Sequence, residues 1–121
     1  MVDEERVMRL AGEVTRDVAR LRTLSEADNL TDLPDQLDAV KYRFITAIEG
    51  CVSIAHHVLV SEGWSAPDSN AEAIRGLAAH GVVKSQLAAE VAKAAGFRNL
   101  LVHRYGDIDD EAVVAALGRI G

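Results

Sequence analysis

The segment from Leu33 to Ser61 reads LPDQLDAVKYRFITAIEGCVSIAHHVLVS. Its apolar side chains recur at steps of three and four residues, the spacing that lines one face of an α-helix. We therefore predict a long helix here, with Pro34 in its first turn and Gly63 at its end. The face that this helix buries is predicted to contain Leu37, Val40, Phe44, Ile48, Cys51, Ala55 and Val58.

The segments on both sides of this helix also predict helices. Residues 3–24 carry an apolar stripe at the same spacing, and the polar residues 25–34 end that helix. Within this polar segment, Thr31 or Asp32 could cap the long helix. The stripe consists of Val7, Leu10, Val14, Val18 and Leu21.

Three further helices are predicted after a loop at residues 62–68. Ser69 and Glu72 have the spacing of a capping box, which begins a short helix that ends near residue 79, before His80 and Gly81. A fourth helix is predicted over residues 83–105, and a fifth, capped by Asp107, continues to residue 117.

Composition and length fit one helical domain. The chain has 121 residues, of which 49% are hydrophobic and only 4% aromatic, so it has enough apolar side chains for a core but few strand formers. We predict a single all-α domain over residues 1–121, an up-and-down bundle of four to five helices with short connections.

Nothing in the sequence indicates secretion or a membrane. Cys51 is the one cysteine and cannot form an internal disulfide, and the amino terminus is charged where a signal peptide is apolar. The longest mostly apolar run, residues 51–60, is too short to span a bilayer. We expect a cytoplasmic protein without a membrane contact.

The distribution of charge is uneven. The formal net charge of −6 argues against a nucleic-acid ligand, since phosphate attracts Lys and Arg. Between Lys84 and Tyr105, however, the sequence contains four basic residues and one acidic residue, which gives this segment a net charge of +3. The segment is therefore a modest basic region in an acidic protein.

The fourth predicted helix contains Arg98-Asn-Leu-Leu-Val-His-Arg-Tyr105. Its apolar stripe of Leu87, Val91 and Ala94 continues, in helical phase, to Arg98, Val102 and Tyr105. An unpaired arginine in a core is very costly. We therefore expect Arg98 either to be paired or to face a polar groove.

The helical geometry separates the polar residues of this segment. Asn99 and His103 are four residues apart and share a face, whereas Arg98 and His103 are about 140° apart around a straight helix. Two arrangements would bring Arg98 and His103 to one substrate: a local distortion near Gly96, or a second copy of the helix across a dimer.

These residue types suit metal-independent RNA cleavage. A histidine that titrates near neutral pH can move the proton of a ribose 2′-hydroxyl or of the leaving 5′-oxygen. Arg98 can hold the phosphate and stabilise the extra negative charge of the transition state, and Asn99 can orient His103 or the ribose. We predict no cofactor and no metal site; His56 and His57 are adjacent on a helix and point about 100° apart.

The run Gly96-Phe-Arg-Asn-Leu-Leu-Val-His-Arg-Tyr-Gly-Asp-Ile-Asp109 resembles the signature of the HepT-like family, which are minimal members of the HEPN superfamily. That signature is an arginine, four to six residues, then a histidine, with a tyrosine two residues later; here these are Arg98, His103 and Tyr105. The segment from Phe44 to His57 resembles the second helix of the family, which often has an aspartate where Ser53 stands.

The resemblance implies a HEPN-like bundle and a ribonuclease toxin that acts as a homodimer, with both copies of the motif lining a groove at the interface. It also implies an antitoxin partner, a minimal nucleotidyltransferase of the MntA type, which transfers AMP to Tyr105. Bulk and negative charge on Tyr105 would then lie beside Arg98, where substrate phosphate is expected. Glu49, Tyr42 and Arg104 are further candidates to line the groove.

A second interpretation belongs to another class of protein. The same helices can form a non-catalytic binding module that docks a minimal nucleotidyltransferase and presents Tyr105 or a groove to it. The intact set of Arg98, Asn99 and His103 favours the enzyme, and the acidic net charge favours the binding module.

Overall fold

The fold of this protein, taken from a computed structural model, is described for residues 2–64, 68–104 and 107–118. These residues form five α-helices and one short 3-10 helix, and no strand occurs among them. The elements are α1 (Glu4–Leu24), η1 (Leu30–Asp32), α2 (Pro34–Ser61), α3 (Asn70–Ala79), α4 (Ser85–His103) and α5 (Asp110–Gly118). The predicted all-α bundle of four to five helices is confirmed.

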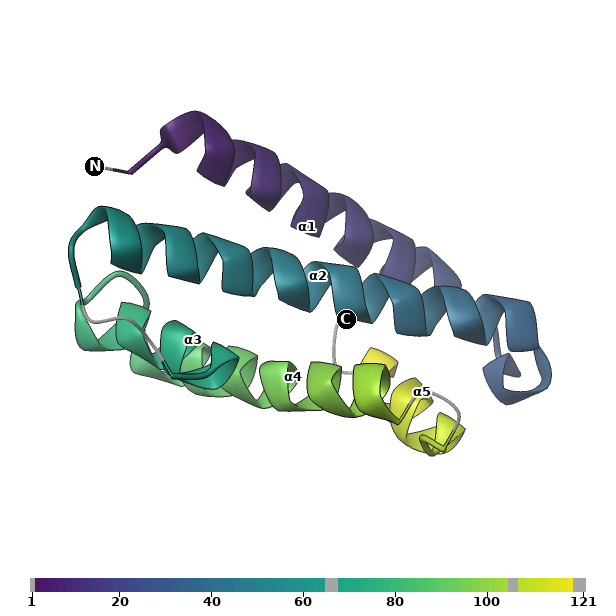
Figure 1. The fold of residues 1–121 in the computed structure, drawn as a ribbon. Helices are drawn as coiled ribbons and strands as arrows, with labels where there is room; N and C mark the ends of the chain where they lie inside the picture. Colours follow the sequence, from purple (N-terminus) through teal and green to yellow (C-terminus); the bar gives the residue numbers. More distant parts are fainter. Residues whose placement is uncertain (1, 65–67, 105–106, 119–121) are drawn as a thin grey trace.

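Helix α2 lies in the middle of the molecule (Figure 1). Helix α1 runs antiparallel along one side of α2, α3 and α4 cover the other side, and α5 folds back beneath the beginning of α2. The central position of α2 explains why its predicted stripe is buried at Leu37, Val40, Phe44, Ile48 and Ala55, while Cys51 and Val58 are half-buried.

The beginning of α2 differs from the prediction. Neither Thr31 nor Asp32 caps it, because both residues belong to η1, which turns the chain so that Leu30 is buried. The N-cap of α2 is Leu33, whose side chain makes no capping hydrogen bond, and Pro34 begins the helix. A proline fits there because its missing N–H would have no helical partner.

The other helix ends mostly follow the predicted signals. Helix α1 begins one residue later than predicted, because the side chain of Asp3 accepts a hydrogen bond from the amide N–H of Arg6 and caps the helix. Ser69 accepts one from the amide of Glu72 and caps α3. Helices α2 and α3 are followed by glycines at positive φ, 72° at Gly63 and 73° at Gly81, which glycine adopts without a steric penalty.

Helix α4 buries a different face from the one predicted. Its buried residues are Ala88, Ala92, Ala95 and Leu101, one position round from the predicted stripe, whereas Leu87 and Val102 are exposed. The alanines allow α4 to approach α2 and α3 closely, so the larger side chains stay outside. The helix ends at His103 instead of residue 105; Tyr105 and Gly106 lie outside the described residues.

Helix α5 begins later than predicted. Asp109, not Asp107, accepts a hydrogen bond from the amide of Glu111 in the first turn, and α5 buries Val113 and Leu117. The buried Lys41 of α2 forms an ion pair with Asp110 of α5, with 3.0 Å between Nζ and Oδ1. This ion pair joins the last helix to the central one.

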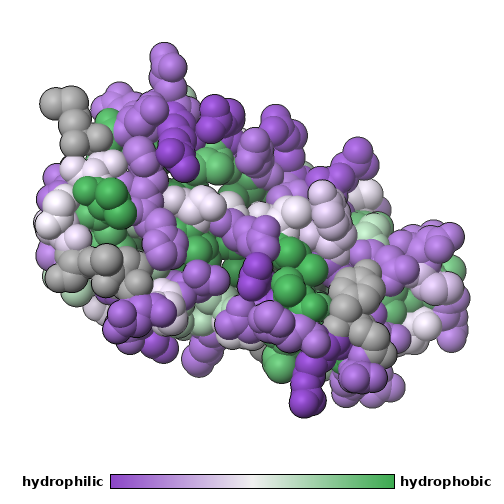
Figure 2. Space-filling model, viewed as in Figure 1, coloured by the Kyte–Doolittle hydropathy of each residue, from purple (hydrophilic) through white to green (hydrophobic). Residues whose placement is uncertain are grey.

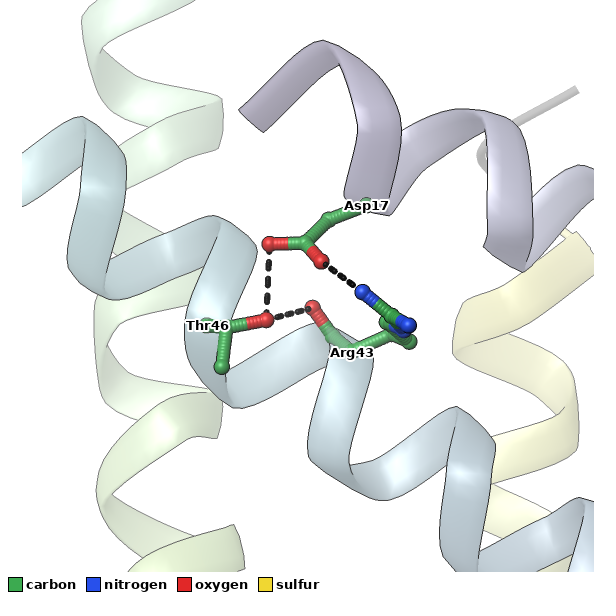
Figure 3. A network of polar contacts seen from close by, with 3 residues as sticks. All are labelled: Asp17, Arg43 and Thr46. Atoms are coloured by element: carbon green, nitrogen blue, oxygen red, sulfur yellow. Dashed lines mark hydrogen bonds and ion pairs between the residues drawn. The ribbon is translucent and has the colours of Figure 1, made fainter. Parts of the chain in front are cut away.

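A buried polar network holds α1 against α2 (Figure 3). Asp17 of α1 is only 5% exposed. Its Oδ1 accepts a hydrogen bond of 2.9 Å from Nη1 of Arg43, and its Oδ2 accepts one of 2.7 Å from Oγ1 of Thr46. Both carboxylate oxygens therefore have partners on α2.

By length and composition alone, α2 could cross a membrane. The core helix of a soluble protein passes the same test, and α2 contacts α1, α3, α4 and α5 along its length. The test is weak evidence for a membrane protein, and the cytoplasmic location remains a prediction.

Candidate functional site

Arg98 lies in the fourth turn of α4 and reaches across to α2. Its Nη2 and Nε donate hydrogen bonds of 2.6 and 3.2 Å to the same oxygen, Oε1 of Glu49, and its Nη1 donates one of 3.1 Å to Oδ1 of Asn99. The side chain of Arg98 is 22% exposed and that of Glu49 is 47% exposed. Arg98 is therefore paired, which is the first of the two alternatives predicted for it; that it faces a polar groove stays a prediction.

The three hydrogen bonds leave part of the guanidinium group unused among the described residues. A guanidinium has five N–H donors, and these bonds use one on each nitrogen. One donor on Nη1 and one on Nη2 remain, and two such donors can bind a phosphate through two oxygens. Glu49 fixes the position of Arg98 and also competes, as an anion, with any phosphate that approaches it.

An aromatic contact between α4 and α2 lies next to Arg98 in the sequence. The rings of Phe97 and Phe44 meet edge to face, with 5.5 Å between their centroids. Phe44 is buried in α2, and Phe97 precedes Arg98 in α4. The contact sets the rotation of α4 on α2, which keeps Arg98 directed toward Glu49. Hydrophobic periodicity does not reveal this pair, since its members are 53 residues apart.

His103 is the last residue of α4, and its side chain is exposed. Among the described residues, no hydrogen bond or ion pair joins it to Arg98 or Asn99. Helix α4 is continuous through Gly96, so the predicted local distortion is absent. The other arrangement considered for Arg98 and His103, a second copy of the helix across a dimer, stays a prediction.

The candidates for lining a groove differ in their positions. Glu49 contacts Arg98 directly. Tyr42 is exposed and lies two turns before Glu49 on nearly the same face of α2, about 10 Å away along the axis. Arg104 follows α4 and is exposed. A contact of Tyr42 or Arg104 with Arg98 is not found in the described part of the chain, so their role stays a prediction.

Three large apolar side chains of α4 are exposed, and two of them, Leu87 and Val102, lie about 60° apart around the helix, on the side of Arg98. Leu87 and Leu100 are each 51% exposed, and Val102 is 40% exposed. Hydrophobic surface is visible between polar side chains over α2 and α4 (Figure 2). Exposed apolar residues that gather on one helix are typical of a surface that another chain covers.

Other residues considered from the sequence have structural surroundings. Nε2 of His57 accepts a hydrogen bond of 3.0 Å from the amide of Asp3, which ties the beginning of α1 to α2. Burial raises the pKa of the Cys51 thiol, which disfavours its reactive thiolate form. No group of three His, Cys, Asp or Glu side chains that could hold a metal ion occurs in residues 2–64, 68–104 and 107–118.

A helical bundle with an arginine and a histidine five residues apart at the end of its fourth helix has the features of a HEPN domain. The chain belongs to the HepT-like ribonuclease family, because the sequence profile described as Ribonuclease HepT-like matches residues 5–120. The resemblance inferred from the residues 96–109 is confirmed.

Two curated relatives agree with this family. The chain is 30% identical over 102 residues to a candidate RNase of Archaeoglobus fulgidus, a match that covers 83% of this chain and 75% of the relative. It is 28% identical over 111 residues to the tRNA nuclease HepT of Aphanizomenon flos-aquae, which covers 91% of this chain and 74% of the relative.

Two solved structures share the fold. One is a toxin–antitoxin complex with AMP-PNP, with a TM-score of 0.84 and 20% identity, covering 98% of this chain and 89% of the other. The second is the tri-AMPylated HEPN toxin of Shewanella oneidensis in complex with an MNT antitoxin. Its TM-score is 0.86 at 21% identity, and the match covers 98% of this chain and 88% of the other. At these identities the similarity establishes the HEPN fold.

Proposed function

We propose that this protein is a metal-independent endoribonuclease and the toxin of a HEPN/MNT toxin–antitoxin pair, acting in the cytoplasm. The observation that carries the proposal is the half-buried Arg98, held by Glu49 and Asn99 with two donors left over, on the helix that ends in the exposed His103. Membership of the HepT-like ribonuclease family supports RNA as the substrate.

In the proposed reaction, the ribose 2′-oxygen attacks the adjacent phosphorus and the bond to the 5′-oxygen breaks. The products are a 2′,3′-cyclic phosphate and a 5′-hydroxyl. Arg98 binds the phosphate and stabilises the charge that develops on it, while His103 takes the proton of the 2′-hydroxyl or gives one to the leaving oxygen. Asn99 orients His103 or the ribose.

A homodimer would complete this site. Two proton transfers need two groups, and one straight helix does not direct Arg98 and His103 to a single phosphate. Leu87 and Val102 lie on the same side of α4 as Arg98, and pairing this side with its copy would bury both of them and would bring two motifs together in one groove. Each His103 could then carry one of the two transfers.

We further propose that a nucleotidyltransferase antitoxin of the MntA type inactivates the enzyme by attaching AMP to Tyr105. One solved structure with this fold is an AMPylated HEPN toxin bound to an MNT antitoxin, which supports a partner of this kind. Tyr105 follows the exposed His103 by two residues, so an added phosphate there would be close enough in sequence to compete for Arg98.

The test is cleavage of mixed cellular RNA in EDTA by purified protein whose mass shows Tyr105 to be unmodified. We expect cleavage by the parent protein, and at least a hundredfold loss in the His103→Ala and Arg98→Ala variants. His56→Ala is the matched control, since it removes a histidine of α2 to which we assign no role. Equal activity in all four proteins would show that the RNase is a contaminant.

The second candidate function, a non-catalytic module that docks a nucleotidyltransferase, is favoured by the net charge of −6. It predicts no RNA cleavage by unmodified protein. A parent protein that binds a nucleotidyltransferase but leaves RNA intact in this assay would replace the first proposal with the second.

A further inference from the structure

A hollow of about 420 Å³ lies between α1 and α2, away from the contacts of Arg98. It is lined by Arg16, Ala19, Arg20, Thr23 and Arg43. Three of these five residues are arginines, and strongly hydrophilic side chains gather along α1 in Figure 2. A cationic hollow is unexpected in a protein whose net charge is −6.

The positive charge of this hollow is not neutralised by the surrounding described residues. The carboxylate of Asp17 pairs with Arg43 and accepts a hydrogen bond from Thr46 (Figure 3), and no ion pair joins it to Arg16 or Arg20. Arg16 and Arg20 are exposed, and no ion pair joins either of them to another described residue. With Asp17 counted, the hollow has a charge of +2.

The spacing of the two free arginines also favours a bound anion. Arg16 and Arg20 are four residues apart on α1, and like charges at that spacing destabilise an isolated helix. The network with Asp17 holds Arg43 on the opposite wall. Guanidinium groups on two walls of one hollow can contact successive oxygens of a phosphate chain.

An exposed aromatic ring adjoins the hollow. The guanidinium carbon of Arg43 lies 5.9 Å from the centroid of the Tyr42 ring, and Tyr42 is 59% exposed. Tyr42 is also on nearly the same face of α2 as Glu49, two turns away. Arginines that follow a backbone, beside a ring on which a base can stack, are the features with which proteins bind single-stranded RNA.

We propose that the α1–α2 hollow is a second RNA-binding site, which holds the phosphate backbone of single-stranded substrate with Arg16, Arg20 and Arg43 while Tyr42 stacks on a base. The inference rests on the proposed function for its ligand, and adds a contact beyond the cleaved phosphate. Long substrates gain affinity from this contact, whereas a dinucleotide is too short to reach it.

The experiment compares two double variants that remove the same charge. R16Q/R20Q alters the hollow, and R6Q/R75Q, the matched control, removes two exposed arginines from elsewhere on α1 and α3. Affinity is measured by fluorescence anisotropy with a 20-nucleotide 2′-O-methyl RNA, which lacks the attacking hydroxyl and therefore reports binding without cleavage. Circular dichroism verifies that each variant is folded.

We expect R16Q/R20Q to raise the Kd about tenfold at 100 mM KCl. The slope of log Kd against log salt should also become shallower by about 1.4, at about 0.7 for each phosphate that the variant no longer neutralises. The control should match the parent, and cleavage of a dinucleotide should be the same in all three proteins. Equal loss of affinity in both double variants, or in neither, would overturn the proposal; loss in neither would leave an acidic protein surface as the ligand of the hollow.

The two proposals can fail separately. If the parent binds the RNA and R16Q/R20Q does not, while no protein cleaves RNA, the hollow is supported and the ribonuclease reaction is refuted. If the parent cleaves RNA and both double variants bind it equally well, the reaction stands and the hollow is refuted. A parent that binds no RNA would overturn both.

Discussion

Removal of the Asp17 carboxylate tests how α1 is held on the bundle. Asp17 is 5% exposed and accepts two charge-assisted hydrogen bonds from α2, one from Arg43 and one from Thr46. Hydrogen bonds to a charged group contribute about 1.5–3 kcal/mol each. The side chain of Arg43 is 34% exposed, so water will take over part of the role of the carboxylate, and Thr46 keeps its second acceptor, the carbonyl oxygen of Arg43.

We therefore expect Asp17→Ala to lower the free energy of unfolding by about 2–3 kcal/mol, less than the sum of two full charged hydrogen bonds. Asp17→Asn has nearly the same shape. Its amide oxygen can accept from Arg43 and its amide nitrogen can donate to Thr46, so it loses mainly the charge. We expect the Asn variant to lose about 1 kcal/mol.

The assay is urea unfolding followed by circular dichroism at 222 nm, repeated at several protein concentrations because dimer formation would add to the apparent stability. A double-mutant cycle of Asp17→Ala with Thr46→Val should give a coupling energy of about 1 kcal/mol. A loss below about 0.5 kcal/mol in Asp17→Ala, the range of ordinary surface substitutions, would refute the reasoning that this carboxylate fixes α1.

Three further predictions concern α2. Gly50→Ala would place a Cβ atom 2.5 Å from Cγ2 of Val14, so we expect the free energy of unfolding in urea to fall by about 1–2 kcal/mol. Val14→Ala should restore that stability in the double variant. A Gly50→Ala variant of unchanged stability would contradict the close contact. Glu49→Gln keeps an oxygen acceptor for Arg98 but removes the competing charge, so KM for RNA should fall several-fold at unchanged kcat. Glu49→Ala removes the acceptor as well and should lower kcat. Identical kinetics in the two variants would exclude a positioning role for Glu49. Because burial raises the pKa of the Cys51 thiol, its alkylation by iodoacetamide at pH 8 should be much slower in folded than in urea-unfolded protein. The unfolded chain releases that thiol proton first, so this residue's contribution to stability is present below the ordinary thiol pKa and declines at more alkaline pH.

The sequence predicts the elements that follow strong local rules. Five of the seven residues of the predicted α2 stripe are buried, and Cys51 and Val58 are half-buried, because α2 is covered on opposite sides by other helices. The ends of α3 are also predicted correctly, since Ser69 as a cap and Gly81 at positive φ act through the neighbouring backbone alone. Local signals of this kind need no knowledge of the tertiary structure.

The buried face of α4 was predicted wrongly for a physical reason. Hydrophobic periodicity ranks Leu87 and Val102 above alanine, but α4 is packed through Ala88, Ala92 and Ala95 because small side chains let helices approach closely. The rule assumes that large apolar residues face the core of their own chain. In α4 that assumption fails, because the buried positions next to α2 and α3 are mostly taken by alanines.

The candidate site was predicted as separate residues and not as a set of contacts. Arg98, Asn99 and Glu49 were each identified, but the ion pair across 49 residues depends on how α4 is rotated on α2. Asp17 gave no signal at all, because a charged residue in an amphipathic helix is normally assigned to the exposed side. Its burial is intelligible only with its two α2 partners in place.

Three charged residues of α2 together explain how one helix organises the molecule. Lys41 pairs with α5, Arg43 with α1 and Glu49 with α4. Successive residues of an α-helix are rotated by about 100° around its axis. Viewed along the axis of α2, Arg43 therefore points about 160° from Lys41 in one sense of rotation, and Glu49 points about 80° from Lys41 in the opposite sense. The three ion pairs therefore leave α2 in different directions, so we expect Asp17→Ala to loosen α1 without moving Arg98. Stability at the α1 contact and the proposed chemistry at the α4 contact would then be separable properties of the same helix.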